Sequence, residues 1–261
     1  MKKAHQTGTK EAVFISRVRT RINDLLASEM PGFAFDAADG KMLRGRLVYA
    51  MGGHNLEAAA AIELMHSGSL FHDDVIDDAD LRRGKPAFWK TFGVKGAILF
   101  GDLHFFLALR LLADQPGLQK DLIETAGIVC KAAAEEELSQ TPQDRVELAR
   151  RKTGPLFAFA AMTGAVDEES RAALREAGFL LGTAYQLADD IYDATGREPQ
   201  ADKSLRRDKS APAATLQAIE ALCKKSSGLL EDWPDLQGAW DHYLERHIRP
   251  AIEHFTAEAP C

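Results

Sequence analysis

The chain has 261 residues, of which 46% are hydrophobic and 27% charged, a composition that excludes general disorder and suits a globular protein. Its 32 basic and 39 acidic residues leave a formal net charge of −7, which argues against a nucleic-acid-binding protein. The three cysteines are too widely spaced for a disulfide framework or a zinc site, and the N-terminus lacks the apolar run of a secretory signal. We therefore expect a cytoplasmic protein without a transmembrane segment, since no stretch reaches ~18 uninterrupted apolar residues.

Helical spacing of apolar residues runs through almost the whole chain. Alanine and leucine far outnumber valine and isoleucine, which favours helices over strands. In residues 174–188, leucine or alanine recurs every three or four positions, as on one face of a helix. Glycine and proline divide the chain into helix-length segments, and no repeat or change of composition marks a boundary. We therefore predict an all-α fold of about nine or ten helices in a single domain over residues 1–261.

The first of two acidic runs covers residues 72–78 and reads His-Asp-Asp-Val-Ile-Asp-Asp. Asp73 and Asp77 are four residues apart, so both carboxylates lie on the same face of the predicted helix. Like charges at this spacing repel each other, and the apolar neighbours Leu70 and Phe71 increase the cost of holding them. A bound cation would remove that repulsion.

The second run repeats the pattern far downstream. It reads Asp-Asp-Ile-Tyr-Asp over residues 189–193, again in a helical segment with apolar neighbours. Mg²⁺ prefers oxygen ligands and typically takes one or two carboxylates together with substrate phosphates and water. Two solvated acidic helix faces would give the same runs, but the repetition favours two clusters that hold a metal-bound diphosphate. The six predicted metal ligands are Asp73, Asp74, Asp77, Asp189, Asp190 and Asp193.

Basic residues near both acidic runs would bind a second diphosphate directly. Arginine contacts phosphate through two parallel hydrogen bonds, whereas lysine provides a point charge. Each of these residues alone has the pattern of an ordinary surface charge, so only the group as a whole supports the interpretation. The group comprises Lys41 and Arg44 before the first run, Arg82 and Arg83 after it, Lys152 with Thr153 between the runs, and Lys203 and Lys209 after the second run.

These segments resemble motifs of the trans-isoprenyl diphosphate synthases, or polyprenyl synthetases. Residues 63–86, which contain the first acidic run and an Arg-Arg-Gly sequence, resemble the family's first aspartate-rich motif, and residues 185–196 resemble its second. Residues 40–44 resemble its Gly-Lys-x-x-Arg-Pro element, and residues 151–157 resemble its Lys-Thr segment. The four matches occur in the family's order along the chain.

The resemblance implies a fold, a reaction and a set of partners. The fold is an isoprenoid-synthase-type helical bundle around a central cavity, and the assembly is a homodimer. The reaction is the Mg²⁺-dependent condensation of an allylic diphosphate with isopentenyl diphosphate, which releases diphosphate and extends a trans-prenyl chain. We expect no protein side chain as the base, because the released diphosphate would take the proton.

The resemblance also implies a role for each site residue. Asp73, Asp77 and Asp189 are expected to be the direct metal ligands and to be catalytic, together with Lys152. Isopentenyl diphosphate is expected to bind to Lys41, Arg44, His66 and Arg83. The allylic diphosphate is expected to bind to Arg82, Lys152, Thr153, Gln186 and one of Lys203 and Lys209. His66 lies two helical turns before Asp73, and Gln186 one turn before Asp190, so both positions suit these roles.

The sequence departs from the family's pattern at Gly45, where the family has the proline that follows the upstream arginine. In the family, bulky residues just before the first run form the floor of the prenyl pocket. Gly68 and Ser69 occupy these positions and are small, which predicts a deeper pocket and a product of C20 or longer. Phe105 and Phe106 of the next predicted helix would close the pocket instead, or would be ordinary core residues.

Three other interpretations stay open. A terpene synthase, either a cyclase or a head-to-head synthase, also uses acidic clusters with Mg²⁺, but it would not need basic residues for a metal-free diphosphate. A non-catalytic partner subunit of a heteromeric prenyl synthase would keep the fold, but we would expect it to lose part of the acidic runs. A purely structural helical protein would leave the repeated acidic pattern without explanation.

Overall fold

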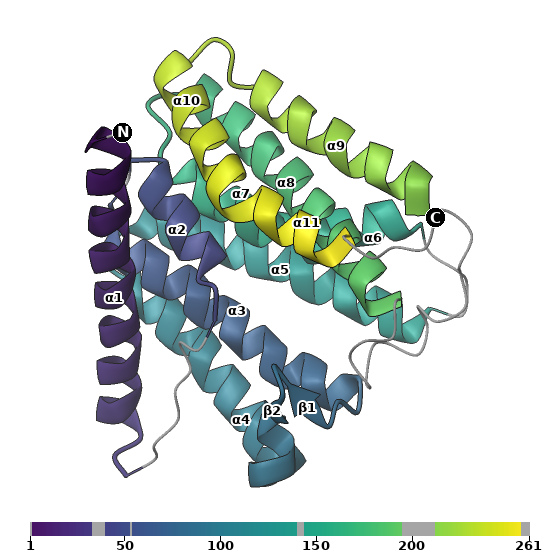
Figure 1. Cartoon of the computed structure of the whole chain (residues 1–261). Coiled ribbons are helices and arrows are strands. Elements are labelled where there is room, and N and C mark those ends of the chain that lie inside the picture. The colour runs from purple at the N-terminus through teal and green to yellow at the C-terminus, as the bar shows by residue number, and fades with distance from the viewer. Residues whose placement is uncertain (1, 33–39, 53, 140–143, 195–211, 257–261) are drawn as a thin grey trace. The chain divides into compact units, whose positions relative to one another are not determined.

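A computed structural model of the protein describes residues 2–32, 40–52, 54–139, 144–194 and 212–256. These residues are almost entirely helical, which confirms the predicted all-α fold (Figure 1). The chain divides into two compact units, Met1–Ile123 and Glu124–Cys261. The single domain around a central cavity stays a prediction.

The first unit contains helices and one short hairpin. Its elements are α1 (Lys2–Glu29), α2 (Leu43–Ala50), α3 (Leu56–Ile76), β1 (Leu81–Arg82), β2 (Lys85–Pro86) and α4 (Phe88–Leu111). Helix α5 (Pro116–Leu138) begins in this unit and continues into the second. Helix α3 is central in the first unit, because α1, α2 and α4 all pack against it.

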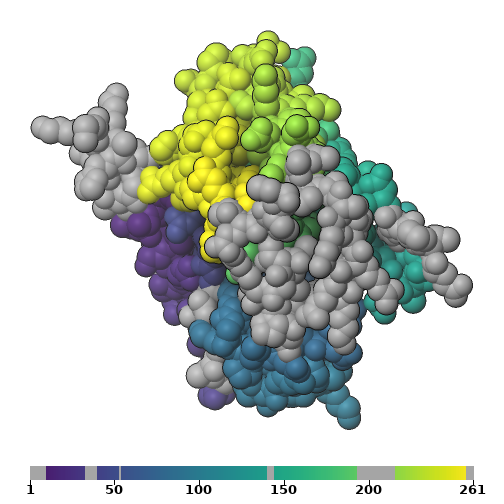
Figure 2. Space-filling view, turned by 45° about the vertical axis from the view of Figure 1, so that its right-hand side comes forward, coloured from purple at the N-terminus to yellow at the C-terminus, as the bar shows by residue number. Residues whose placement is uncertain are grey.

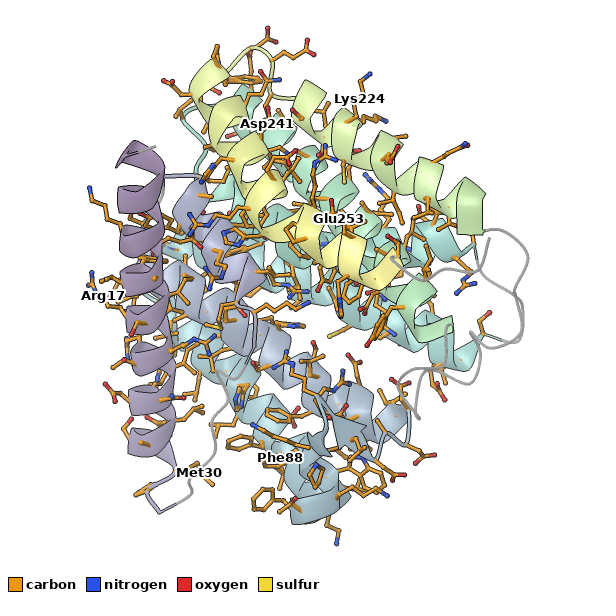
Figure 3. The ribbon with its side chains drawn as sticks, in the orientation of Figure 1. Arg17, Met30, Phe88, Lys224, Asp241 and Glu253 are labelled. Carbon is orange, nitrogen blue, oxygen red and sulfur yellow. The ribbon has the colours of Figure 1, made fainter. Side chains whose placement is uncertain are left out.

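Small residues near the start of α3 and an aromatic residue near its end fix its position. Asn55 caps the helix, since its side-chain oxygen accepts a hydrogen bond from the amide of Ala58 at 3.0 Å. Residues 58–61 are four alanines without solvent exposure, which allows neighbouring helices to approach closely. Phe71 packs against Phe88 of α4, labelled in Figure 3, with ring centroids 4.8 Å apart. This contact holds the last turns of α3 against the start of α4.

The hairpin between α3 and α4 is an element that the sequence did not predict. Strand β1 pairs with β2 in antiparallel orientation, with Arg82 opposite Lys85. The two turn residues both have positive φ, 54° at Arg83 and 74° at Gly84. This conformation is that of a type I′ turn, which usually begins with Asn, Asp or Gly. The hairpin was missed because an arginine at the first turn position carries no such signal.

Helix α4 is bent at Gly93, whose φ of 75° and ψ of 164° lie outside the helical region. Among the described residues, it is the one helix long and apolar enough to cross a membrane, with a mean hydropathy of 1.5. A mostly buried core helix of a soluble protein meets the same criterion, but only 33% of this stretch is buried, although α4 packs along α3. The expected absence of a transmembrane segment therefore stays a prediction.

The second unit is a helical bundle centred on α8. Its elements are the rest of α5, α6 (Arg145–Lys152), α7 (Gly154–Met162), α8 (Glu168–Ala194), α9 (Pro212–Gly228), α10 (Pro234–Tyr243), the π-helical turn η2 (Leu244–Ile248) and α11 (Arg249–Thr256). Helices α6, α7, α9 and α11 all pack against α8. Figure 2 shows part of the outer surface of the helices from α9 to α11, in green and yellow.

Two glycines of α8 allow α7 to lie directly on it. All residues of α7 are buried. A Cβ atom at Gly178 would lie 2.4 Å from Cα of Ala158, and one at Gly182 would lie 2.7 Å from Cα of Gly154. A larger side chain at either glycine would therefore push the two helices apart. This close contact fixes the junction between α6 and α7, where Thr153 lies.

Candidate active site

The first acidic run lies at the C-terminal end of α3. Asp73 is half-buried in the last turn, whereas Asp77 is exposed and caps the helix. The partial negative charge of a helix C-terminus disfavours carboxylates, in addition to their mutual repulsion. A cation held by both carboxylates would offset these two effects.

Asp74 has a different environment from its two neighbours. Its side chain is 3% exposed, and its Oδ1 accepts hydrogen bonds from Nη2 of Arg82 and from Nε of Arg82 at 2.8 Å. Burial lowers the pKa of Arg82, but this pairing and the charges of Asp73 and Asp77 outweigh burial and raise the pKa. Arg82 is therefore charged and lies within electrostatic range of the whole run. The pairing favours Asp73 and Asp77 over Asp74 as direct metal ligands.

His66 lies among the basic residues of the first unit. Its pKa is well below the ordinary value, because burial disfavours the charged imidazole and because Arg44, Arg83 and Arg82 place positive charge nearby. The imidazole is therefore neutral near pH 7, and one ring nitrogen is an acceptor while the other is a donor. The structure thus brings together residues from α2, α3 and the hairpin that the sequence placed in one diphosphate site.

Arg83 lies against the segment that precedes α2. A Cβ atom at Gly40 would be only 2.9 Å from Nη1 of Arg83, so the absence of a side chain at Gly40 makes room for the guanidinium group. Arg44 is 8% exposed at the start of α2, whereas Lys41 is exposed. Lys41 is adjacent in sequence to the contact between Gly40 and Arg83. The predicted isopentenyl diphosphate residues Lys41, Arg44, His66 and Arg83 are therefore neighbours in the first unit.

In the second unit, a chain of polar contacts joins the second acidic run to the junction between α6 and α7. Oδ1 of Asp190 accepts a hydrogen bond from Nε2 of Gln186 at 2.9 Å. Oε1 of Gln186 accepts one from Oγ1 of Thr153 at 2.6 Å. Nη2 of Arg145, at the start of α6, lies 3.7 Å from Oδ2 of Asp190. Three predicted residues thus form one network with an arginine that was not predicted.

Lys152 is held at the end of α6 by an acidic partner. Its Nζ lies 2.6 Å from Oε2 of Glu136 in α5, and both side chains are about one-third exposed. The neighbouring residue Thr153 belongs to the polar chain just described. Lys152 therefore lies next to the residues with which the sequence grouped it.

Some predicted site residues have little or no described environment. Asp189 is half-buried in α8. The side chain of Asp193 lies outside the described residues, and so do Lys203 and Lys209. Their roles stay predictions.

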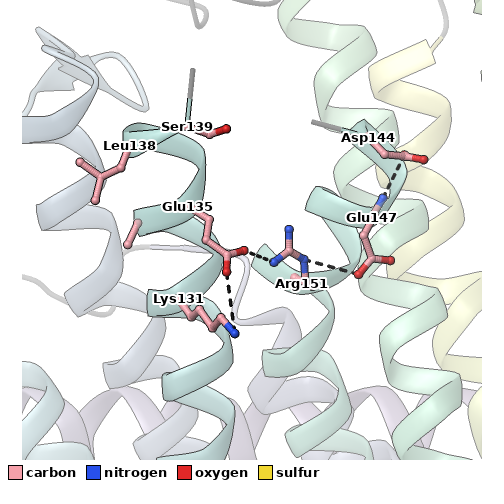
Figure 4. Close-up of a pocket in the computed structure, with 8 residues that line it drawn as sticks. Lys131, Glu135, Leu138, Ser139, Asp144, Glu147 and Arg151 are labelled. Carbon is pink, nitrogen blue, oxygen red and sulfur yellow. Dashed lines mark hydrogen bonds and ion pairs between the residues drawn. The ribbon is translucent and has the colours of Figure 1, made fainter. Parts of the chain in front are cut away.

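A pocket of about 640 Å³ lies in the second unit between the end of α5 and α6 (Figure 4). Arg151 forms ion pairs there with Glu135 and with Glu147, the second at 3.4 Å. Lys131 lies 3.8 Å from Glu135, so the charges around the pocket compensate one another. None of the predicted site residues is among the described residues that line this pocket.

The residues predicted to limit the prenyl pocket differ in their environments. A Cβ atom at Gly68 would lie 2.7 Å from Cε1 of Phe105, so this ring fills the space beside the glycine. Phe106 is 69% exposed and is therefore not a core residue of the first unit. Ser69 is half-buried and lies four residues before Asp73, on the same face of α3. Of the two phenylalanines, Phe105 is thus the one that lies against Gly68.

The donor groups of the two acidic runs fit Mg²⁺. They are carboxylate oxygens, which suit a hard cation, whereas zinc sites are built mainly from cysteine and histidine. Among the described residues, no group of three His, Cys, Asp or Glu side chains is arranged around one point. Mg²⁺ needs only one or two carboxylates when substrate phosphates and water complete its coordination. The described residues suited to hold it are therefore Asp73 and Asp77 in the first run and Asp189 in the second.

Three side chains in these networks were not predicted from the sequence. Arg145 precedes Lys152 by seven residues, or two helical turns, so the spacing could have placed it on the same face. Glu63 of α3 accepts a hydrogen bond from the amide of Gly45 at 2.8 Å. Its partner is distant in the chain, as is that of Glu136, and no local pattern indicates either contact.

Comparison with known proteins identifies relatives of the chain. Residues 33–237 match a family model described as Polyprenyl synthetase. The chain is 31% identical to the Short chain isoprenyl diphosphate synthase of Methanothermobacter thermautotrophicus, with 92% of this chain and 80% of that protein covered. It is also 31% identical to the Geranylgeranyl diphosphate synthase of Methanosarcina mazei, with 80% of this chain and 74% of that protein covered.

Solved structures share the fold. The crystal structure of a geranyltranstransferase from Thermotoga maritima is similar with a TM-score of 0.76 and 24% identity. The similarity covers 94% of this chain and 99% of that chain. It agrees with the predicted isoprenoid-synthase type of helical bundle.

Proposed function

Because the chain belongs to the polyprenyl synthetase family, we propose that it is a prenyltransferase that condenses an allylic diphosphate with isopentenyl diphosphate. The observation that carries this proposal is the group of His66 and three arginines, of which Arg82 pairs with the acidic run of α3. A neutral histidine among arginines suits a diphosphate bound without a metal, whereas carboxylates suit a diphosphate bound through one. An enzyme that joins two diphosphate substrates needs both kinds of site.

In the proposed reaction, the bond between the allylic carbon and its diphosphate oxygen breaks. The double bond of isopentenyl diphosphate attacks that carbon, and loss of one proton to the released diphosphate restores a double bond in the longer trans-prenyl product. The side chains that would orient the departing diphosphate are Arg82, Lys152, Thr153, Gln186 and one of Lys203 and Lys209. Bound Mg²⁺ supplies positive charge that stabilises this leaving group. An apolar cavity, as the family resemblance implies, would exclude water from the allylic cation.

We propose a product of C20 or longer, with its length limited by Phe105. Ser69 is small and lies on the face of Asp73, so it would not end a pocket that begins at the acidic run. Phe105 fills the space beside Gly68, and its removal would deepen the pocket. A C20 product corresponds to the geranylgeranyl group in the name of one relative. Chromatographic sizing should show longer products for Phe105→Ala and shorter products for Ser69→Phe, and unchanged products in both variants would refute this assignment.

We also propose a cytoplasmic homodimer, with α4 in the contact between the two copies. Leu99 and Phe106 are seven residues apart on one face of α4, and each is 69% exposed. An apolar row at this spacing typically packs against another helix. Light scattering should give the mass of a dimer, and Phe106→Lys should shift it towards that of a monomer. A monomeric wild-type protein would refute the proposal.

The experiment that tests the function is an incubation of the purified chain with Mg²⁺, labelled isopentenyl diphosphate and a panel of allylic diphosphates. We expect label in a prenyl diphosphate only when both substrates and Mg²⁺ are present. Conversion of an allylic diphosphate without consumption of isopentenyl diphosphate would indicate a terpene synthase instead. No consumption with any allylic diphosphate would indicate a non-catalytic subunit.

A further inference from the structure

The start of α2 lies in the interior of the first unit, and its capping residue provides no side-chain hydrogen bond. Met42 precedes the helix, is 4% exposed and has left-handed backbone angles, with φ 53° and ψ 42°. The first amide N–H groups of a helix have no acceptor within the helix itself. Leu43, Arg44 and Gly45 are all buried, so water does not replace that acceptor. An acceptor from another element is therefore required.

Glu63 of α3 provides this acceptor. Glu63 is only 5% exposed, and its Oε1 accepts the hydrogen bond from the amide of Gly45 at 2.8 Å. Burial raises the pKa of the Glu63 carboxyl group, whereas the charge of Arg44 and the amides of Gly45 and Arg44 act in the opposite direction. The carboxylate thus interacts with the backbone of Arg44 and Gly45 and with the charge of Arg44. A negative charge at a helix N-terminus is also favoured by the helix dipole.

Two other contacts hold the residues that precede α2. Nη2 of Arg19 in α1 donates to the carbonyl oxygen of Gly40 at 2.5 Å. Nε of Arg46 donates to the carbonyl oxygen of Lys41 at 2.9 Å. The backbone from residue 40 to residue 45 is therefore held near its beginning by arginines and at its end by Glu63.

Glu63, which holds the start of α2, lies on α3 close to residues of the predicted diphosphate site. Glu63 and His66 are three residues apart, so they are neighbours on the surface of the helix. The positive charge of Arg44 acts to lower the pKa of Glu63 and also that of His66, so Arg44 lies near both side chains. A nearby carboxylate also compensates part of the charge of the buried guanidinium group when no diphosphate is bound.

We propose that Glu63 is a positioning residue that fixes the start of α2 so that Lys41 and Arg44 can bind the diphosphate of isopentenyl diphosphate. Glu63 does not touch the substrate and acts through the backbone of Arg44 and Gly45. The inference rests on the proposed function, because that function identifies the diphosphate. The contact requires a residue other than proline at position 45, since proline has no amide hydrogen to donate to Glu63.

The test compares Glu63→Gln and Glu63→Leu with the wild-type protein. Glutamine keeps an acceptor for the amide of Gly45 but loses the charge, whereas leucine loses both. Glu57→Gln is the matched control, because Glu57 lies in the same helix but pairs with Arg21 at 2.9 Å. The measurements are kcat, KM for each of the two substrates, and hydrogen exchange of the amides at the start of α2.

We expect Glu63→Leu to raise KM for isopentenyl diphosphate about tenfold and Glu63→Gln to raise it less, with KM for the allylic substrate changed less than about twofold. Exchange at the start of α2 should increase in the same order, and Glu57→Gln should match the wild type. A purely structural role would change kcat or the active fraction without separating the two KM values, and this outcome would overturn the proposal. If Glu63→Leu does not fold, the glutamine variant decides by the same criterion.

Failure of the proposed function gives a different result. In that case the wild-type protein would not consume isopentenyl diphosphate at all. Binding of inorganic diphosphate, measured by calorimetry, would then test Glu63 directly. Equal affinity in the wild type and in Glu63→Gln would overturn the positioning role, whereas weaker binding by the variant would support it.

Discussion

The two units bury different kinds of polar side chain. Among the described residues, the buried polar side chains of the first unit are all acidic or basic, and they are Glu11, Arg44, Glu63, Asp74 and His104. Those of the second unit are all hydroxyl groups, and they are Thr125, Thr153, Ser170, Thr183 and Ser226. A hydroxyl group can find an acceptor locally, as Thr183 does with the carbonyl oxygen of Phe179 at 2.7 Å, although Thr153 donates to the distant Gln186. A buried charge, by contrast, needs a compensating partner. The interior of the first unit therefore depends more on distant contacts and on pH.

The second acid of each run shows the same contrast. The side chain of Asp74 is 3% exposed and is paired with Arg82. The side chain of Asp190 is 18% exposed, accepts a hydrogen bond from the neutral Gln186, and has Arg145 only at 3.7 Å. Identical acidic patterns thus have different surroundings, and the difference can be tested by three predictions.

The largest effect is expected where the two runs should behave alike. Asp73→Ala and Asp189→Ala should each lower kcat by about a thousandfold, because departure of the diphosphate depends on stabilisation of its charge. The measurement is Mg²⁺-dependent incorporation of labelled isopentenyl diphosphate. Asp114→Ala, at an exposed position of the first unit, is the control and should keep wild-type turnover. Near-normal activity in either site variant would contradict the metal assignment for that run.

The next largest effect should be a difference between the two units in their sensitivity to acid. His104 has no solvent exposure, and burial lowers its pKa from 6.5 to about 4. The unfolded chain therefore binds one more proton between these values, and the free energy of unfolding should fall by about 3 kcal/mol as the pH falls through this range. The stabilisation is complete above pH 6.5. Glu63 has a raised pKa and acts in the opposite direction, so a variant that removes only the histidine is needed.

Hydrogen exchange at pH 7 and pH 4.5 measures this difference. Amides of α3 and α4 should lose protection at the lower pH, whereas those of α7 and α8 should lose much less. His104→Phe should weaken the pH dependence of the first unit, because phenylalanine does not titrate. Equal loss of protection in both units would show that the buried charges do not control acid sensitivity.

The smallest effect concerns the second acids. Asp74→Ala should lower the free energy of unfolding by about 2 kcal/mol, because Arg82 loses a buried partner. Asp190→Ala should lower it by less than about 1 kcal/mol, because Asp190 is more exposed than Asp74 and one of its partners is neutral. Urea unfolding of the two variants at pH 7 measures both values. Similar losses would mean that the difference in surroundings has no energetic consequence.

Local patterns in the sequence were sufficient to predict the helices and the shared faces of the acids. Asp73 and Asp77 need only helical spacing to lie on one face, and the same spacing places His66 two turns earlier. Glycine and proline also marked the ends of helices well enough to predict an all-α fold, which the structure confirms. The seven-residue spacing between Arg145 and Lys152 is a local pattern of the same kind, because it places both residues on one helix face.

Other features depend on residues that are distant in the chain. The sequence left open whether Phe105 lies against the small residue Gly68, and the structure places the ring of Phe105 beside that glycine. The hairpin was missed because Arg83 takes a backbone conformation that arginine rarely adopts. Such features follow from packing between elements, which a local pattern does not specify.

The sequence by itself determined which residues could share a helix face, since a helix repeats every 3.6 residues whatever surrounds it. It also determined the family, because the order of its motifs is a property of the chain. Only the tertiary structure decided that Asp74 pairs with Arg82, that Phe105 covers Gly68, and that Glu63 supports the start of α2. The physical reason is that a buried charge or a small residue requires a partner, and folding alone determines which distant residue provides it.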